Sequence, residues 1–98
     1  MAKAGVNSLV RSLSAEVAPD RINVNAIAPG YVATSLIRSQ LDDPAQRERI
    51  LQAIPWHRVA RPEEIAGLAV FLASDAADYV TGQTWVMDGG MMTTWGGA

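Results

Sequence analysis

The sequence predicts an α/β fold in the order helix, strand, irregular segment, helix, strand. Three features predict it: a first segment with helical apolar spacing, a short alternating segment rich in β-branched residues, and a second helix followed by a short apolar run. The 98 residues suffice for one small domain. A strand, a crossover helix and a second strand would form one βαβ unit with parallel strands.

A helix is predicted over residues 1–18. Its apolar positions recur at the spacing of one helical face, and they are Val6, Leu9, Val10, Leu13 and Val17. Pro19 follows them, and proline disfavours helical geometry at the residue before it. The first helix is therefore expected to end near residue 18.

A short strand is predicted over residues 22–28, with the sequence INVNAIA. Apolar residues alternate there with Asn23 and Asn25, and a Pro-Gly pair closes the segment. We expect one face of this strand to be dry and the other to carry the two asparagines. These side chains suit structural hydrogen bonds better than catalysis.

The second half of the chain contains a further helix and a further strand. A short helix over 44–53 is favoured inside an otherwise irregular stretch, with a proline in its first turn. A longer helix is predicted over 62–77, where Glu63 and Glu64 suit the positive end of the helix dipole. We interpret these glutamates as helix-start charges rather than as a catalytic carboxylate pair. The last strand is predicted over 84–88.

Composition excludes several classes of protein. The net charge is −2 and the seven arginines are scattered, so no basic face for a nucleic acid is expected. Cysteine is absent and His57 is the single histidine, which leaves no thiolate or histidine-based metal site. No apolar run approaches the roughly 18–20 residues that span a bilayer, and no signal peptide is visible. The sequence thus predicts a soluble, cytoplasmic protein without a membrane partner.

Self-contained catalytic motifs are missing. The eight glycines fit neither the G-x-G-x-x-G pattern nor a phosphate loop, and no G-x-S-x-G elbow is present. His57 lies in a loop-like stretch and is expected to be a surface or packing residue. Lys3 is the only lysine in the chain.

Four segments in order carry a resemblance to a known family. They are KAGVNSL, RINVNAIAPGYVAT, RPEEIAGLAVFLASDAADYVTGQ and DGG. Together they resemble the C-terminal part of the short-chain dehydrogenase/reductase family, and the resemblance is weakest over 35–57. It implies the C-terminal fragment of a doubly wound, Rossmann-type parallel sheet.

The resemblance casts Lys3 as the lysine of the family's Tyr-x-x-x-Lys signature. An ammonium beside a phenol lowers the pKa of the phenol, so that it can pass a proton near neutral pH. The same lysine would donate to the ribose hydroxyls of a nicotinamide cofactor, NAD or NADP. The partner tyrosine would lie two positions upstream of Met1, and neither Tyr31 nor Tyr79 has a lysine four residues later. Whether Met1 is the true start or an internal residue of a longer enzyme stays open.

The resemblance also implies a cofactor-side loop over 29–34. Its Pro29, Gly30, Val32 and Thr34 would hold the nicotinamide, with the Val32 backbone and the Thr34 hydroxyl on the carboxamide. Residues 35–60 would form the family's variable substrate lid.

Two residues of that lid are weak candidates for substrate contact. Ile54 and Trp56 could line an apolar pocket wall, although core packing explains them equally well.

The sequence supports two hypotheses for the function, an enzyme and a non-catalytic module. The first is an NAD(P)-dependent oxidoreductase acting on a small-molecule carbonyl or secondary alcohol, of the sugar-alcohol or 3-oxoacyl type, present as a fragment that is inactive alone. The second is a non-catalytic oligomerisation or remnant module. The resemblance further implies a homo-oligomer, tetramer or dimer, in the full-length family.

Overall fold

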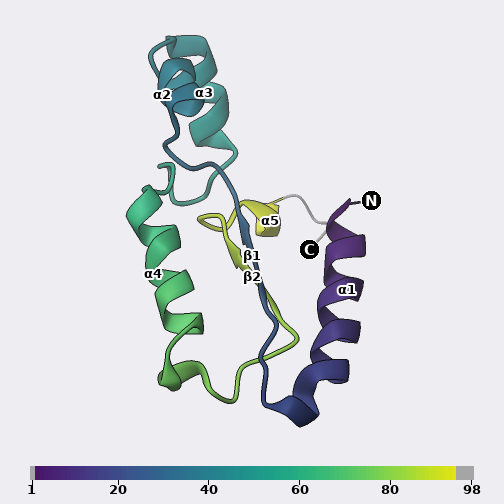
Figure 1. Ribbon diagram of the computed structural model, residues 1–98. Coiled ribbons are helices and arrows are strands. Elements are labelled where there is room, and N and C mark those ends of the chain that lie inside the picture. The colour runs from purple at the N-terminus through teal and green to yellow at the C-terminus, as the bar shows by residue number, and fades with distance from the viewer. Residues whose placement is uncertain (1, 95–98) are drawn as a thin grey trace. The chain divides into compact units, whose positions relative to one another are not determined.

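The computed structural model describes residues 2–94, with side chains over 5–92. It contains α1 (Ala2–Val17), β1 (Ala26–Pro29), α2 (Ser35–Leu41), α3 (Pro44–Gln52), α4 (Pro62–Leu72), β2 (Thr84–Met87) and α5 (Met91–Thr94), with 3-10 turns at Ala18–Asp20 and Asp75–Ala77 (Figure 1). The predicted α/β fold is confirmed. The chain forms two compact units, one up to Ala28 with Gly67–Trp85, the other Pro29–Ala66 with the chain from Val86 onward.

The two strands pair with each other in a parallel sheet of order β1-β2. The Ala26 amide donates to the Gln83 carbonyl at 2.9 Å, and the Gly30 amide donates to the Met87 carbonyl at 2.9 Å. The same sequence offset separates donor from acceptor in both bonds, as parallel strands require. The described part of the sheet therefore matches the parallel βαβ arrangement that the sequence predicts.

The first strand is shorter than its predicted range of 22–28. The Val24 amide donates to Thr81 Oγ1 at 2.9 Å, and the Val24 carbonyl accepts from the Gly82 amide at 2.7 Å. These bonds bind the segment to a loop and not to a strand, so β1 begins only at Ala26. The prediction that one face of this segment is dry is also wrong at Ile22, because that side chain is exposed.

The two asparagines before β1 hold the chain to the same loop, in the first unit. Asn23 Nδ2 donates to the Ala77 carbonyl at 3.2 Å. Asn25 Nδ2 donates to the Val80 carbonyl at 3.0 Å, and its Oδ1 accepts from the Gln83 amide at 3.2 Å. Both side chains thus bond to backbone groups of this loop, and Asn25 supplies both a donor and an acceptor. They act as the structural residues that the sequence suggests.

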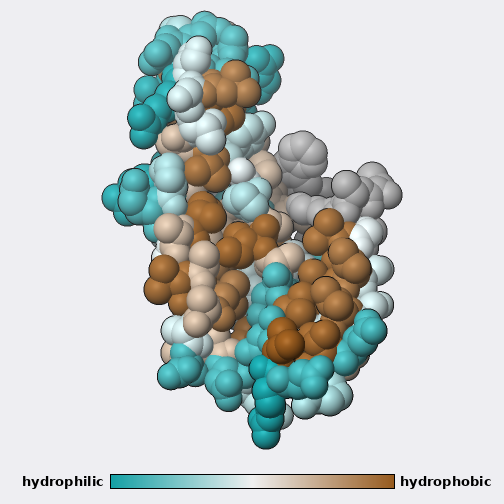
Figure 2. Space-filling view, in the orientation of Figure 1, coloured by the Kyte–Doolittle hydropathy of each residue, from teal (hydrophilic) through white to brown (hydrophobic). Residues whose placement is uncertain are grey.

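Helix α1 buries only part of its apolar stripe among the described residues. Val10 and the small Ser14 are buried, whereas Leu9 is 63% exposed. Figure 2 shows apolar residues gathered over α1. Gly82 approaches this helix closely, since a Cβ at Gly82 would lie 2.9 Å from Ser14 Oγ.

Helix α4 ends earlier than the predicted range of 62–77. Ser74 has extended backbone angles, and its hydroxyl donates to the Phe71 carbonyl at 2.7 Å. A serine hydroxyl that bonds nearby backbone competes with continued helix. Helix α4 therefore ends at Leu72, and the chain then forms the 3-10 turn at Asp75–Ala77. The final strand fits its prediction within one residue.

Helix α5 was not expected from the sequence. It follows β2, and the Asp88 carboxylate organises its start: Oδ1 accepts from the Gly90 amide at 2.9 Å and Oδ2 accepts from the Met92 amide at 3.0 Å. An aspartate at this place satisfies amides that a helix start leaves without acceptors.

The predicted lid over 35–60 contains two helices in the second unit. Helices α2 and α3 lie side by side (Figure 1). Thr34 precedes α2, and Pro44 opens α3 at its first position, as the sequence predicts. Ile50 and Ile54 are buried and provide the core of this region. None of the described helices is both long and apolar enough to cross a bilayer.

Candidate functional site

Gly30 brings the loop beyond β1 against the exit of β2. Its amide donates to the Met87 carbonyl. A Cβ at Gly30 would lie 2.8 Å from Asp88 Cβ and 3.0 Å from Asp88 Cα, closer than real Cβ atoms approach. Gly30 is therefore required for close approach, and not for a left-handed backbone, since its φ is not positive.

The next residues of the loop are held by Ala60. Val32 and Ala60 form an isolated parallel bridge. The Ala60 amide donates to the Tyr31 carbonyl at 2.9 Å, and the Ala33 amide donates to the Ala60 carbonyl at 2.9 Å. The amide of Val32 finds no acceptor among the described residues. This bridge fixes the loop and leaves one N–H able to donate to a ligand.

Thr34 ends the loop and caps α2. Its Oγ1 accepts from the Ile37 amide at 3.3 Å, and its amide donates to the Val32 carbonyl at 2.7 Å. A hydroxyl that accepts one bond still has its own hydrogen to donate. The loop thus offers an amide at Val32 and an exposed hydroxyl at Thr34, two donors or acceptors of the kind that bind a carboxamide.

A pocket of about 280 Å³ adjoins this loop within the second unit. It is lined by Tyr31, Ile54, Trp56, Arg58, Ala60, Glu64 and Val86–Gly90. Tyr31 belongs to both the loop and the pocket, so the two features are continuous. Ile54 and Trp56 contribute different surfaces, because Ile54 is 2% exposed and Trp56 is 70% exposed.

Two glycines of the pocket lining lie against the end of the lid. Gly89 and Gly90 have φ values of 63° and 91°. A Cβ at Gly89 would lie 2.8 Å from Ile54 Cγ2, and one at Gly90 would lie 3.2 Å from Pro55 Cγ. The Trp56 amide also donates to the Gly89 carbonyl at 3.2 Å. The end of the lid therefore packs directly on the backbone of Gly89 and Gly90, which have no side chains of their own.

An ion pair stands at the rim of the pocket. Arg58 donates through Nη1 to Glu64 Oε1 at 2.7 Å and through Nη2 to Glu64 Oε2 at 2.9 Å. Glu64 Oε1 also accepts from the Arg61 amide at 2.9 Å. The Arg58 bond first, and the Arg61 amide next, lower the pKa of Glu64 to about 2. The same pair raises the pKa of Arg58 above its usual value.

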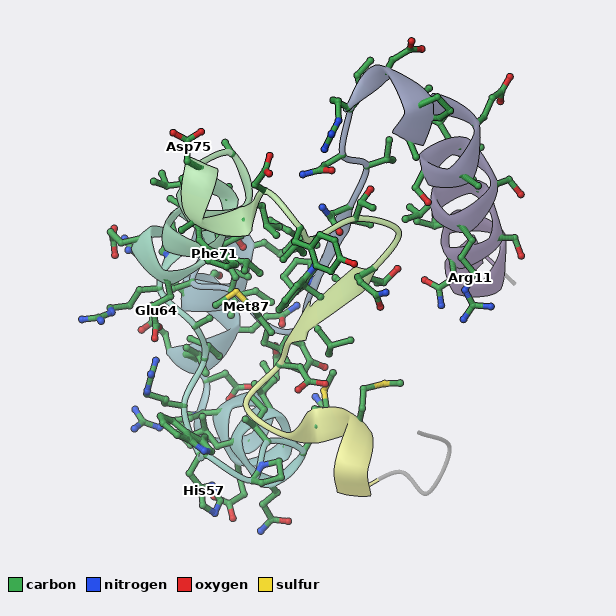
Figure 3. All side chains as sticks on the ribbon, turned by 90° about the horizontal axis from the view of Figure 1, so that it is seen from below. Arg11, His57, Glu64, Phe71, Asp75 and Met87 are labelled. Atoms are coloured by element: carbon green, nitrogen blue, oxygen red, sulfur yellow. The ribbon has the colours of Figure 1, made fainter. Side chains whose placement is uncertain are left out.

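The Arg58 guanidinium also lies near the Trp56 ring, with 5.4 Å between its carbon and the ring centroid. Glu64 thus fixes Arg58, and Arg58 covers part of the indole. Figure 3 shows Glu64 and Met87, two of the lining residues, together with His57, which projects outward.

Replacing Glu64 by glutamine should change the pH dependence of stability. The folded pKa of about 2 lies below the unfolded value near 4.5. Glu64 therefore stabilises the fold fully above pH 4.5, and this contribution is lost as the pH falls towards 2. The difference in free energy of unfolding between wild type and Glu64→Gln, measured by urea titration, should be constant above pH 5 and shrink below pH 4.

The matched control is Glu63→Gln, since Glu63 is the preceding residue of the same turn and forms no ion pair with a described side chain. A Glu63→Gln variant with the same loss of stability as Glu64→Gln would contradict the assignment.

The structure describes the side chains of the predicted site residues with the exception of Lys3. Pro29 is the last residue of β1, Gly30, Val32 and Thr34 lie in the loop that follows it, and Ile54 and Trp56 line the adjoining pocket. Lys3 lies in the first turn of α1, and its side chain is outside the described part.

Sequence reasoning missed the Arg58–Glu64 pair and the lining by Tyr31 and Asp88. Six residues separate Arg58 from Glu64, which matches no helical pair spacing, so no pattern signalled the contact. No group of three metal-ligating side chains occurs in the described part.

A parallel strand pair with a helical crossover, and a ligand-suited loop beyond the carboxyl end of a strand, define the class of Rossmann-type α/β proteins. The comparisons identify the family within that class. A family model described as enoyl-(acyl carrier protein) reductase matches residues 1–92. The chain belongs to the short-chain dehydrogenase/reductase family, as the sequence resemblance predicts.

Characterised relatives include enzymes of different names. The chain is 48% identical over 90 residues to the 3-oxoacyl-(acyl-carrier-protein) reductase of Chlamydia trachomatis. This match covers 92% of this chain and 36% of that protein. It is 43% identical over 89 residues to the L-rhamnose 1-dehydrogenase (NAD(P)(+)) of Azotobacter vinelandii, covering 91% and 35%. The chain thus spans about a third of the length of these relatives.

Two solved structures that share the fold contain nicotinamide cofactors. A candidate 2-deoxy-D-gluconate 3-dehydrogenase from Agrobacterium tumefaciens with bound NADP superposes with a TM-score of 0.84 at 48% identity, covering 94% of this chain and 37% of that one. A 4-hydroxyisoleucine dehydrogenase complexed with NADH superposes with a TM-score of 0.87 at 27% identity, covering 93% and 37%.

Proposed function

We propose that this chain is the C-terminal part of an NAD(P)-dependent oxidoreductase that acts on a carbonyl or secondary alcohol. The observation that carries the proposal is the loop at Pro29–Thr34. This loop lies beyond the carboxyl end of β1 and presents the Val32 amide and the Thr34 hydroxyl. The chain belongs to a family of oxidoreductases, which makes a cofactor the ligand that these groups suit. Two solved relatives contain NADP or NADH, which supports a nicotinamide ligand.

The loop residues would bind and orient the cofactor. Gly30 lets the backbone approach β2. The Val32 backbone and the Thr34 hydroxyl would then hold the carboxamide of the nicotinamide. When bound, the nicotinamide supplies or accepts the hydride.

Lys3 would act on the proton side of the reaction. Its ammonium would hold the ribose hydroxyls and lower the pKa of a tyrosine that this chain does not contain at the required position. That tyrosine would pass the proton to or from the substrate oxygen.

The substrate is proposed to be a small molecule of the sugar-alcohol or 3-oxoacyl type. The names of two relatives, a 3-oxoacyl reductase and a rhamnose dehydrogenase, support these two classes. The cofactor is NAD or NADP. We also propose a cytoplasmic homo-oligomer, tetramer or dimer, a proposal that rests on the family resemblance and on the absence of cysteine.

The isolated 98-residue chain is expected to have no dehydrogenase activity and negligible affinity for NAD(P). The tyrosine partner and the glycine-rich first turn of the family pattern are not among its residues. The measurement follows absorbance at 340 nm with ketone and alcohol substrates. Turnover by the isolated chain that is lost in Lys3→Ala would contradict this expectation.

A chimera tests the function itself. In it, this chain replaces the matching third of the 3-oxoacyl-(acyl-carrier-protein) reductase of Chlamydia trachomatis, to which it is 48% identical. Cofactor-dependent reduction of a carbonyl by the chimera supports the oxidoreductase. A folded chimera without any hydride transfer would contradict it.

A second candidate function is a non-catalytic oligomerisation or remnant module. The exposed apolar residues of α1, Val6, Leu9 and Leu13, favour it, because such a face is suited to burial against another chain. A stable oligomer of the isolated chain in sedimentation, combined with an inactive chimera, would favour this candidate.

A further inference from the structure

The pocket beside the cofactor-side loop has mostly apolar walls. Ile54, Val86 and Met87 provide aliphatic surface, and Tyr31 and Trp56 provide aromatic rings. Its volume of about 280 Å³ lies just below the roughly 300–1,000 Å³ found for ligand pockets. A pocket of this size suits one small group of a substrate, such as a ring or a short acyl chain.

The charged side chains of the lining already have partners. Both Nη atoms of Arg58 bond to the two carboxylate oxygens of Glu64. Both carboxylate oxygens of Asp88 accept from backbone amides. The charges of these groups are thus already compensated, so a ligand gains less from binding one of them than from binding an unpaired charge. Glu64 therefore weakens the attraction of Arg58 for an acidic substrate, and Asp88 offers hydroxyls only the lone pairs that its two backbone bonds leave.

The other lining residues with polar side-chain atoms are Tyr31 and Trp56. A polyol places several hydroxyls in such a pocket, and each buried hydroxyl without a partner weakens binding by roughly 5- to 150-fold. An apolar group has no such cost, and it gains by covering Trp56, which is 70% exposed.

We propose that this pocket receives an apolar group attached to the substrate carbonyl, a short acyl chain or a ring, and discriminates against polyols. The inference rests on the proposed function, because it takes the pocket beside the nicotinamide loop as part of the substrate site. It selects the acyl-type substrate over the sugar-alcohol type. Trp56 is the specificity-determining residue, and Glu64 is a positioning residue that acts through Arg58.

Binding to the 98-residue chain tests the pocket without cofactor or turnover. The amide signals of Ala60 and Gly89 and the indole signal of Trp56 are followed by NMR during titration with S-(3-oxohexanoyl)-N-acetylcysteamine and, separately, with D-glucitol. We expect the thioester to shift these signals saturably and glucitol to leave them unchanged at tenfold higher concentration. Glucitol binding as tightly as the thioester, or thioester shifts confined to other residues, would overturn the proposal.

A matched pair of variants identifies the contact. Trp56→Ala should weaken thioester binding at least about fivefold, because it removes the apolar surface that the ligand covers. Leu36→Ala removes a side chain that is also exposed, at 67%, in the same unit but outside the pocket, and it should leave binding unchanged. Equal effects of the two variants would overturn the proposal.

The titration and the chimera fail independently. If the chimera transfers no hydride while the isolated chain binds the thioester at these residues, the proposed function is wrong and the apolar pocket stands. If the chimera is active and the pocket signals do not move, the substrate assignment is wrong and the function stands.

Discussion

Gly30→Ala is expected to destabilise the chain by about 1–3 kcal/mol, the usual cost of forcing an extra methyl group into a packed site. The new Cβ would lie 2.8 Å from Asp88 Cβ and 3.0 Å from Asp88 Cα. Because the second atom is backbone, a change of rotamer does not relieve the clash. Either the loop or the exit of β2 must shift, and the shift weakens the bond from the Gly30 amide to the Met87 carbonyl.

The matched control is Gly67→Ala in α4. A Cβ at Gly67 meets nothing within 4 Å, and the residue is helical, so alanine should stabilise the helix by up to about 1 kcal/mol. Urea unfolding followed by circular dichroism measures both variants. The account predicts changes of opposite sign. Equal or like-signed changes would contradict the close approach of the loop to Asp88.

Gly30→Ala should also affect function in the chimera. The loop residues that follow it, Val32 and Thr34, would move with the backbone, so the KM for the cofactor should rise more than kcat falls.

The elements defined by local pattern could be predicted from the sequence. Helix α1 follows its apolar spacing and ends beside Pro19, and α3 begins at the expected Pro44. The last strand, Thr84–Met87, was predicted within one residue because its apolar run stops at Asp88.

Elements set by distant contacts could not be predicted in this way. The start of β1 depends on the bond from Val24 to Thr81, which are 57 residues apart. Helix α5 depends on the Asp88 carboxylate, and an aspartate before two glycines equally fits a plain turn. The end of α4 depends on the Ser74 hydroxyl, which returns to the Phe71 carbonyl.

The residues of the candidate site also differ in whether the sequence alone could predict them. The loop residues Gly30, Val32 and Thr34 came from the family resemblance, and the structure adds the physical reason that Gly30 must be glycine. The pairing of Arg58 with Glu64 arises only when the end of the lid folds onto the start of α4. Without that pairing, a sequence reading would count Arg58 as a free cation in the site.

The role of Lys3 gives the second large effect. In the chimera, Lys3→Ala should lower kcat by about 10²–10⁴-fold, the usual contribution of positioned proton transfer. Loss of the ammonium also raises the pKa of the tyrosine, so the pH at which kcat rises should move upward. A merely structural role for Lys3 would not move the pH profile.

The pH profile of kcat for the chimera, measured for wild type, Lys3→Ala and Arg11→Ala, therefore tests the central claim most directly. Arg11 is an exposed cation of the same helix and controls for loss of charge alone. We expect Lys3→Ala to lower kcat at least about 100-fold, the lower end of that range, and to shift the profile upward. Arg11→Ala should leave both kcat and the profile unchanged. An unshifted profile with wild-type kcat in Lys3→Ala would contradict the assignment of Lys3 as the catalytic lysine.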